Sequence, residues 1–118
     1  MQLVIDTTQP GHIKLELWTA GRAVAKAEKY TPKISESLLV ETAKLLKKQG
    51  VKLRDLEKIL VNPGPGGFSS TRTGIATANA LSYALGIPLA EFPGGKIKTI
   101  VVPKYDKEPN ITRPKSWK

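Results

Sequence analysis

The segment 58–86 constrains the fold of this chain most, because it joins an apolar run, a loop of glycine and proline, and a long stretch that no proline interrupts. Residues 58–62 (KILVN) have the length and apolar character of a buried strand. Residues 63–67 (PGPGG) exclude regular structure, because proline fixes φ and lacks an N–H while glycine reaches positive φ freely. A serine suits the start of a helix over 70–85, and Gly86 suits its end. We therefore expect a strand, a loop and a helix in that order.

The first thirty residues carry three strand patterns. Residues 3–5 are apolar, 13–17 alternate apolar with charged side chains, and 24–30 alternate weakly. The segment 19–22 has the composition of a tight turn between the second and third of these runs. We therefore expect an antiparallel meander, whose register is set by the apolar face of the second strand.

The run 31–49 predicts the first helix. Thr31 suits the N-cap, Pro32 the first helical position, and Gly50 the residue after the last turn. Its apolar surface is broad. One stripe holds Leu38 and Leu45, the next holds Leu39, Ala43 and Leu46, and Val40 lies outside both stripes. A helix with so broad an apolar surface either only covers a sheet or also touches a further helix, and only the second alternative implies a partner.

The second helix has an outer face that is unusual for a surface helix. No charge occurs over 73–90, which is about the length of a membrane span, but the polar and glycine content favours a helix covered by the fold or by a partner. Its sheet-facing side is expected to hold Gly74, Thr77, Ala78, Leu81 and Leu85. The opposite side, small enough for another helix to approach closely, is expected to hold Arg72, Ile75, Ala76, Asn79 and Tyr83.

The order of elements predicts an α/β fold. After a fifth strand at 87–92 the order is β-β-β-α-β-α-β, a mixed five-stranded sheet with two right-handed crossovers. We expect a lobe over 1–95, followed by an extended basic arm over 96–118 with one more possible strand at 99–102.

The charge and composition limit the classes of partner and site that this chain can have. The net charge is +9, and residues 96–118 hold seven Lys or Arg against two acids. This arm either contacts nucleic acid or another anionic surface, or is a solvated terminus. The chain has no Cys, hence no disulfide or thiolate metal site, and its first residues lack the pattern of a signal peptide. We expect a cytoplasmic protein without a membrane partner.

Few residues suggest catalysis. The glycine loop before a helix is a possible anion site, although no Lys-Ser/Thr follows it as in a Walker A loop. Arg72 in the first helical turn either meets an anionic partner or is solvated. Asp6 either binds a metal-phosphate group, as an acid does in actin-like ATPases, or caps its own backbone. The single His12 has no Cys or second His to share a metal with, and no triad can be assembled.

Two motifs resemble the TsaB (YeaZ) family. The residues IDTT at 5–8 and GPGGFSSTRTG at 64–74 are similar to the family patterns IDTS and GPGSFTGLRIG, and the similarity extends over 34–88. The tail 101–115 resembles the C-terminal end of the family. Departures lie at 67, 69–71 and 73, and at Ile34 where a His is common, and the second lobe of the family has no counterpart in this sequence. The matching loop positions are Gly64, Pro65, Gly66, Phe68, Arg72 and Gly74.

The resemblance implies a single actin-like (ribonuclease H-like) lobe and a non-catalytic subunit of the machinery that makes threonylcarbamoyladenosine (t6A) in tRNA. It implies no cofactor and no metal, docking on TsaD through the two helices, and TsaE as a further partner. Without TsaD, the same helices would form a homodimer. The expected TsaD contacts are Leu38, Leu39, Leu45, Leu46, Arg72, Ile75, Ala76, Asn79 and Tyr83, and possible tRNA contacts are Lys104, Lys107, Arg113 and Lys115.

Two other functions remain open from the sequence. One is a small phosphate- or nucleotide-binding enzyme that uses Asp6, the glycine loop and Arg72. The other is a plain tRNA-binding module that uses the basic arm.

Overall fold

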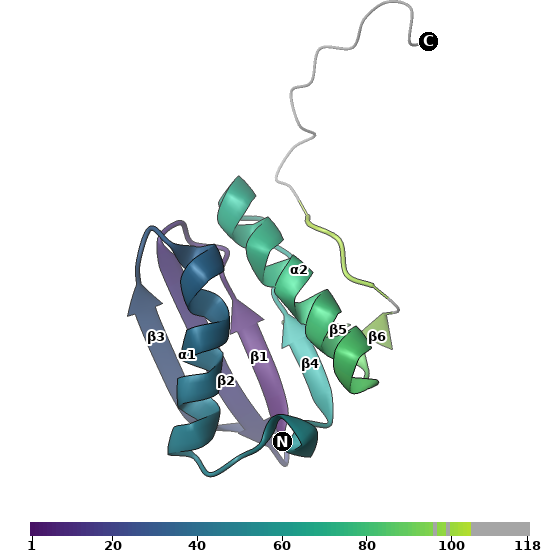
Figure 1. The fold of residues 1–118 in the computed structure, drawn as a ribbon. Coiled ribbons are helices and arrows are strands. Elements are labelled where there is room, and N and C mark those ends of the chain that lie inside the picture. The colour runs from purple at the N-terminus through teal and green to yellow at the C-terminus, as the bar shows by residue number, and fades with distance from the viewer. Residues whose placement is uncertain (96, 99, 105–118) are drawn as a thin grey trace, which may run out of the picture.

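A computed structural model describes residues 1–95, 97–98 and 100–104 of the chain. Within these residues, one mixed sheet has the strand order β3-β2-β1-β4-β5-β6 (Figure 1). The strands are β1 (Gln2–Asp6), β2 (His12–Thr19), β3 (Arg22–Tyr30), β4 (Lys58–Val61), β5 (Leu89–Glu91) and β6 (Ile97–Lys98). The helices are α1 (Ile34–Lys48), the short 3₁₀ helix η1 (Leu53–Asp55) and α2 (Phe68–Leu85).

The predicted topology is confirmed except for the number of strands. β1, β2 and β3 form the antiparallel meander, while β4 pairs in parallel with both β1 and β5. The expected five-stranded sheet is wrong by one strand, since β6 pairs antiparallel with β5 at the edge. Two residues carry no readable periodicity, which is why the sequence did not reveal β6.

Both helices lie on the same face of the sheet (Figure 1). α1 covers the β2–β3 half of the sheet and α2 covers the β1–β4 half. Each helix supplies buried side chains to the core between the helices and the sheet. Alternate strand residues point into this core, including Leu3 and Ile5 from β1 and Leu15 and Leu17 from β2, all 0% exposed. The alternation in β2 follows the period of two expected from the sequence.

The other face of the sheet carries a small apolar cluster instead of a helix. Val4, Leu60 and Ala90 come from adjacent strands, and Trp18 and Phe92 pack against them. The two rings meet edge to face with centroids 5.7 Å apart. Each aromatic side chain therefore shields the central strands from water on the face that has no helix.

Both helices begin at positions other than those expected. The Thr31 hydroxyl accepts the N–H of Lys33 at 3.1 Å in a turn, so α1 begins only at Ile34. α2 begins earlier than the expected residue 70, because the Gly67 carbonyl already accepts the helical N–H of Thr71 at 2.9 Å.

Among the described residues no helix is long and apolar enough to cross a membrane.

The segment after β6 returns along α2. Val101 is 3% exposed and packs into the core, while Ile100 and Val102 on either side are exposed. The expected strand at 99–102 is wrong for its described residues 100–102, because the backbone of Val101 pairs with a side chain of α2 rather than with a strand. The first residues of the predicted arm therefore pack against the lobe.

Candidate functional site

The glycine loop lies where β1 and β4 end side by side, and it packs against the residues that follow β1. A Cβ atom on Gly66 would collide with the backbone of Thr8, and one on Gly74 with the side chain of Thr7. The N–H of Gly67 donates to the Thr8 carbonyl at 2.6 Å. The glycines at these positions thus allow a close approach of two chain segments, which fixes the start of α2 against β1.

Asp6 caps its own backbone, which is one of the two roles that the sequence left open for it. Its Oδ1 accepts the N–H of Thr8 at 2.9 Å and the Thr8 hydroxyl at 2.6 Å, and its Oδ2 accepts the Asn62 amide at 3.1 Å. Asn62 in turn accepts the N–H of Gly64 at 3.0 Å. The carboxylate therefore holds the ends of β1 and β4 together.

The same bonds reduce what the loop can offer an anion. A phosphate cradle needs several free N–H groups pointing at one spot. The N–H groups of Gly64 and Gly67 already donate to protein acceptors. These two N–H groups are therefore not available to a phosphate.

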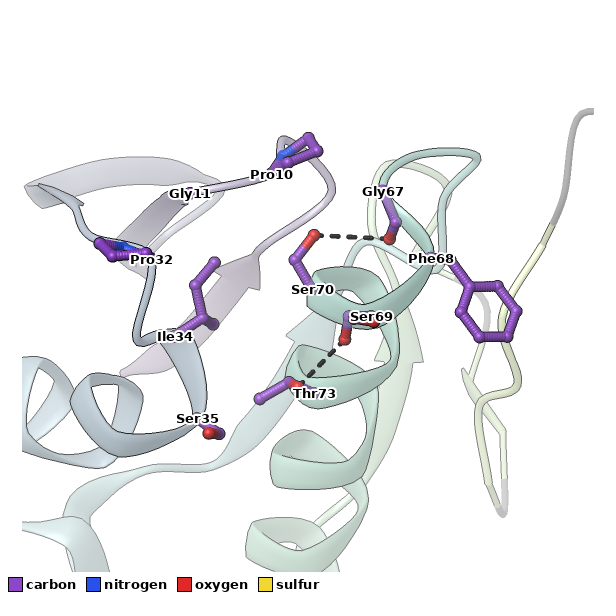
Figure 2. A pocket seen from close by; sticks show the side chains of 10 residues that line it. All are labelled: Pro10, Gly11, Pro32, Ile34, Ser35, Gly67, Phe68, Ser69, Ser70 and Thr73. Atoms are coloured by element: carbon purple, nitrogen blue, oxygen red, sulfur yellow. Dashed lines mark hydrogen bonds between the residues drawn. The ribbon is translucent and has the colours of Figure 1, made fainter.

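A shallow pocket opens between the first turns of α1 and α2 and the turn before β2 (Figure 2). Its volume is about 460 Å³, and its polar side chains are hydroxyls. The hydroxyls of Ser70 and Thr73 donate to the carbonyls of Gly67 and Ser69, at 3.4 and 3.1 Å. The lining residues are Pro10, Gly11, Pro32, Ile34, Ser35, Gly67, Phe68, Ser69, Ser70 and Thr73, none of which is a general acid or base at neutral pH.

His12 lies apart from this pocket, at the start of β2. Its Nε2 is 3.2 Å from Oε1 of Glu28, and its ring stacks on Tyr30 with centroids 4.5 Å apart. Among the described residues no group of three or more His, Cys, Asp or Glu side chains is placed to hold a metal ion. His12 is thus a strand side chain with partners on the neighbouring strand β3.

The predicted TsaD contacts divide into covered and exposed residues. Leu39 is 57% exposed and Tyr83 is 90% exposed, and Arg72 and Ala76 are also exposed. Asn79 is half-buried. The covered residues, each at most 4% exposed within this chain, are Leu38, Leu45, Leu46 and Ile75.

Asn79 is occupied inside the chain. Its side chain donates to the Val101 carbonyl at 3.0 Å and accepts the Val101 N–H at 3.1 Å. The same amide donates to the Ile75 carbonyl at 2.9 Å. Asn79 therefore acts as a clamp that satisfies both backbone groups of a buried residue.

Arg72 also finds an intramolecular contact. Its guanidinium carbon lies 5.1 Å from the centroid of the Phe68 ring, within cation–π range. Because α2 begins at Phe68, Arg72 is its fifth residue and lies just past the first turn, where the helix dipole disfavours a cation less than expected. Of the other loop-motif residues, Gly64 has a φ of +101° and Pro65 is exposed.

Of the predicted tRNA contacts, Lys104 is the one that the structure describes. Its Nζ lies 3.3 Å from Oε1 of Glu91, and its side chain is 56% exposed. Its N–H donates to the Pro63 carbonyl at 2.6 Å. Lys107, Arg113 and Lys115 lie outside the described residues.

Sequence reasoning missed part of the exposed surface of the helices. Ala80 and Ala84 are exposed and follow Ala76 at intervals of four, so the three form an outer row along α2. Val40 on α1 is 52% exposed. The four-residue spacing of the alanines was the signal available in the sequence.

Comparisons with known proteins point to one family. The sequence model described as "TsaD: tRNA N6-adenosine threonylcarbamoyltransferase" matches residues 28–92. A protein of Geotalea uraniireducens with that same name is 44% identical over 54 residues, which are 46% of this chain and 15% of that protein. An uncharacterized protein of Mycobacterium tuberculosis is 36% identical over 67 residues, which are 57% of this chain and 28% of the relative.

Solved structures agree on the fold. YeaZ from Pseudomonas aeruginosa superposes with a TM-score of 0.70 at 29% identity, over 76% of this chain and 43% of that chain. A second structure, of an uncharacterized protein with similarity to peptidase YEAZ from the same organism, gives a TM-score of 0.69 at 28% identity, over 76% of this chain and 41% of the other. The resemblance to the YeaZ (TsaB) family and its actin-like lobe is thereby confirmed. The chain spans less than half the length of each of these relatives.

Proposed function

The chain belongs to the TsaD family of tRNA N6-adenosine threonylcarbamoyltransferases, and we propose that it is a non-catalytic subunit of the t6A machinery that docks on TsaD. Both the family match and the YeaZ-like fold are consistent with a role in t6A synthesis. The docking surface is the outward side of α1 and α2, and TsaD is the partner that covers it.

The observation that carries this proposal is the chemistry of that surface. Arg72 is the only charged residue in the eighteen residues of α2, and the exposed outer row of alanines is small and apolar. On α1, Leu39 and Val40 are 57% and 52% exposed. A surface helix of a monomer normally turns charged side chains to water, so a partner helix is the natural cover. The small side chains of the outer row would let its axis approach closely.

The chemistry of the inner site supports a non-catalytic role. Asp6 is engaged by Thr8 and Asn62, and the pocket between the helix starts offers hydroxyls that bond to backbone carbonyls. Catalysis in the complex is accordingly assigned to TsaD.

Further partners follow from the same proposal. TsaE would join the pair of subunits, and tRNA would be held by the complex with a contribution from the basic arm that begins near Lys104. Without TsaD, the outward side of the helices would pair with a second copy about a two-fold axis.

Co-expression with the TsaD of the same organism, followed by sizing of the purified complex, tests the proposal. We expect a heterodimer that is lost when Ala76→Glu and Ala80→Glu place two charges on the outer row. Thr19→Glu, at the exposed last residue of β2, is the control and should leave the heterodimer intact. A complex that survives the double substitution would refute docking through this face. Saturable ATP turnover by the purified chain alone would refute the non-catalytic role.

A further inference from the structure

A second surface feature lies at the other end of α1, away from the glycine loop. There the last turn of α1, the following loop and η1 lie near the N-terminal end of β1 (Figure 1). Residues of these segments line a depression of about 400 Å³. It is lined by Ala43, Leu46, Lys47, Gly50, Val51, Lys52 and Leu53. Its volume lies in the range of small ligand sites.

The wall of this depression is aliphatic. Leu46 is 4% exposed and belongs to the core, Val51 is half-buried, and Leu53 is 46% exposed. None of the lining residues is aromatic, so a nucleobase would find no ring to stack on. An aliphatic side chain would be removed from water there without leaving a polar group unpaired.

The rim of the depression is basic. The thirteen residues 42–54 hold five Lys or Arg and no acid. Lys47 and Lys52 line the depression, and Lys48 and Arg54 are exposed beside it in the sequence. Within the described part of the chain, none of these four cations forms an ion pair.

The acids that flank this run are already engaged. Glu41 lies 3.9 Å from the amines of both Lys29 and Lys44, and Asp55 accepts the N–H of Lys52 at 2.9 Å. A bond from a neutral N–H leaves the charge of Asp55 in place, but the run 42–55 still holds five Lys or Arg against one acid. The rim therefore presents an excess of positive charge around an apolar centre, and its complement is negative charge around an aliphatic group.

We propose that this depression binds an acidic peptide segment, with one or two aliphatic side chains seated against Leu46, Val51 and Leu53. The carboxylates of the segment lie against Lys47 and Lys52 at the rim. An apolar anchor in a pocket with a charged surround is a common way for peptide segments to bind. This proposal does not depend on docking through the outer row of α2.

Fluorescence anisotropy on the whole chain tests it, with the fluorescein-labelled peptide Glu-Asp-Leu-Leu-Glu-Asp as the probe. We expect saturable binding that weakens about tenfold or more when both lysines are reversed in Lys47→Glu/Lys52→Glu. Leu53→Ser, which removes an exposed part of the wall, should weaken it comparably. Lys33→Glu/Lys98→Glu, the same charge change at two exposed lysines that do not line the depression, is the matched control and should leave the affinity unchanged. Circular dichroism verifies that every variant is folded.

Two comparison ligands separate this proposal from others. The peptide Glu-Asp-Ser-Ser-Glu-Asp should bind at least about tenfold more weakly than the leucine peptide. Equal affinity for both peptides would show charge attraction alone and overturn the proposal. An oligouridine that binds more tightly than the leucine peptide at the same salt, and loses that binding in Lys47→Glu/Lys52→Glu, would assign the surface to nucleic acid instead.

Discussion

Replacing Asn79 by alanine removes the side chain that ties the segment after β6 to helix α2. Asn79 donates to the carbonyl of Val101 and accepts its N–H, at 3.0 and 3.1 Å. Val101 is 3% exposed, so water cannot replace either bond without opening the segment. The substitution therefore leaves two backbone groups unpaired or releases Val101 from the core.

The expected cost follows from these contacts. Each buried neutral hydrogen bond contributes about 1 kcal/mol net, so two give about 2 kcal/mol. Alanine in a helix recovers about 0.6 kcal/mol over asparagine. The net loss is about 1.5 kcal/mol, which for a domain of this size lowers Tm by roughly 6 °C.

Thermal unfolding followed by circular dichroism measures this loss, and hydrogen exchange of the Val101 amide locates it. Thr77→Ala is the matched control, because the Thr77 hydroxyl bonds to the Thr73 carbonyl within the same helix, at 2.9 Å. The control should leave Tm nearly unchanged. If Asn79→Ala melts no lower than the control, or its Val101 amide stays equally protected, the clamp contributes nothing and the reasoning fails.

Three further substitutions test other contacts by urea unfolding. Gly74→Ala places a Cβ against the Thr7 side chain and should destabilise by about 1–3 kcal/mol, although alanine is the better helix former; a stabilised variant would show that Thr7 moves aside freely. Trp18→Ala removes the ring that meets Phe92 over the apolar cluster and should cost about 2 kcal/mol or more, and a smaller loss would mean that the ring covers little. Arg72→Ala loses an exposed cation–π contact but also an unfavourable charge at the helix start, so the free energy of unfolding should change by less than about 0.5 kcal/mol.

Much of the fold was predictable because its signals are local. The alternation over 13–17 predicted β2, and the short run at 58–62 predicted β4 as a buried strand, which ends one residue earlier at Val61. The parallel pairing of β1, β4 and β5 follows from the two helical crossovers. β6 escaped prediction because a two-residue strand exists only through its pairing with β5.

The sequence predicted that the helices have an exposed outer face, but not every residue that lies on it. Helical spacing placed Ala76 and Tyr83 on an outward face, where they are exposed, and left open which way Leu39 faces, which is also exposed. It also placed Ile75 outward, but Ile75 is 4% exposed and belongs to the main core together with Ala78 and Val101. Periodicity gives the angle between residues on a helix and not the direction of the sheet or of a returning segment.

The sequence by itself determined the order of strands and helices, the glycine loop before α2 and the low charge of that helix, because backbone propensity and periodicity are properties of neighbouring residues. The tertiary structure alone decided which parts of that loop and helix are available. It brought Gly74 against Thr7 and Asn79 against Val101, contacts across 67 and 22 positions, which no local pattern encodes. Those contacts fix α2 against β1 and occupy the side chain of Asn79, while the outer row of alanines stays exposed.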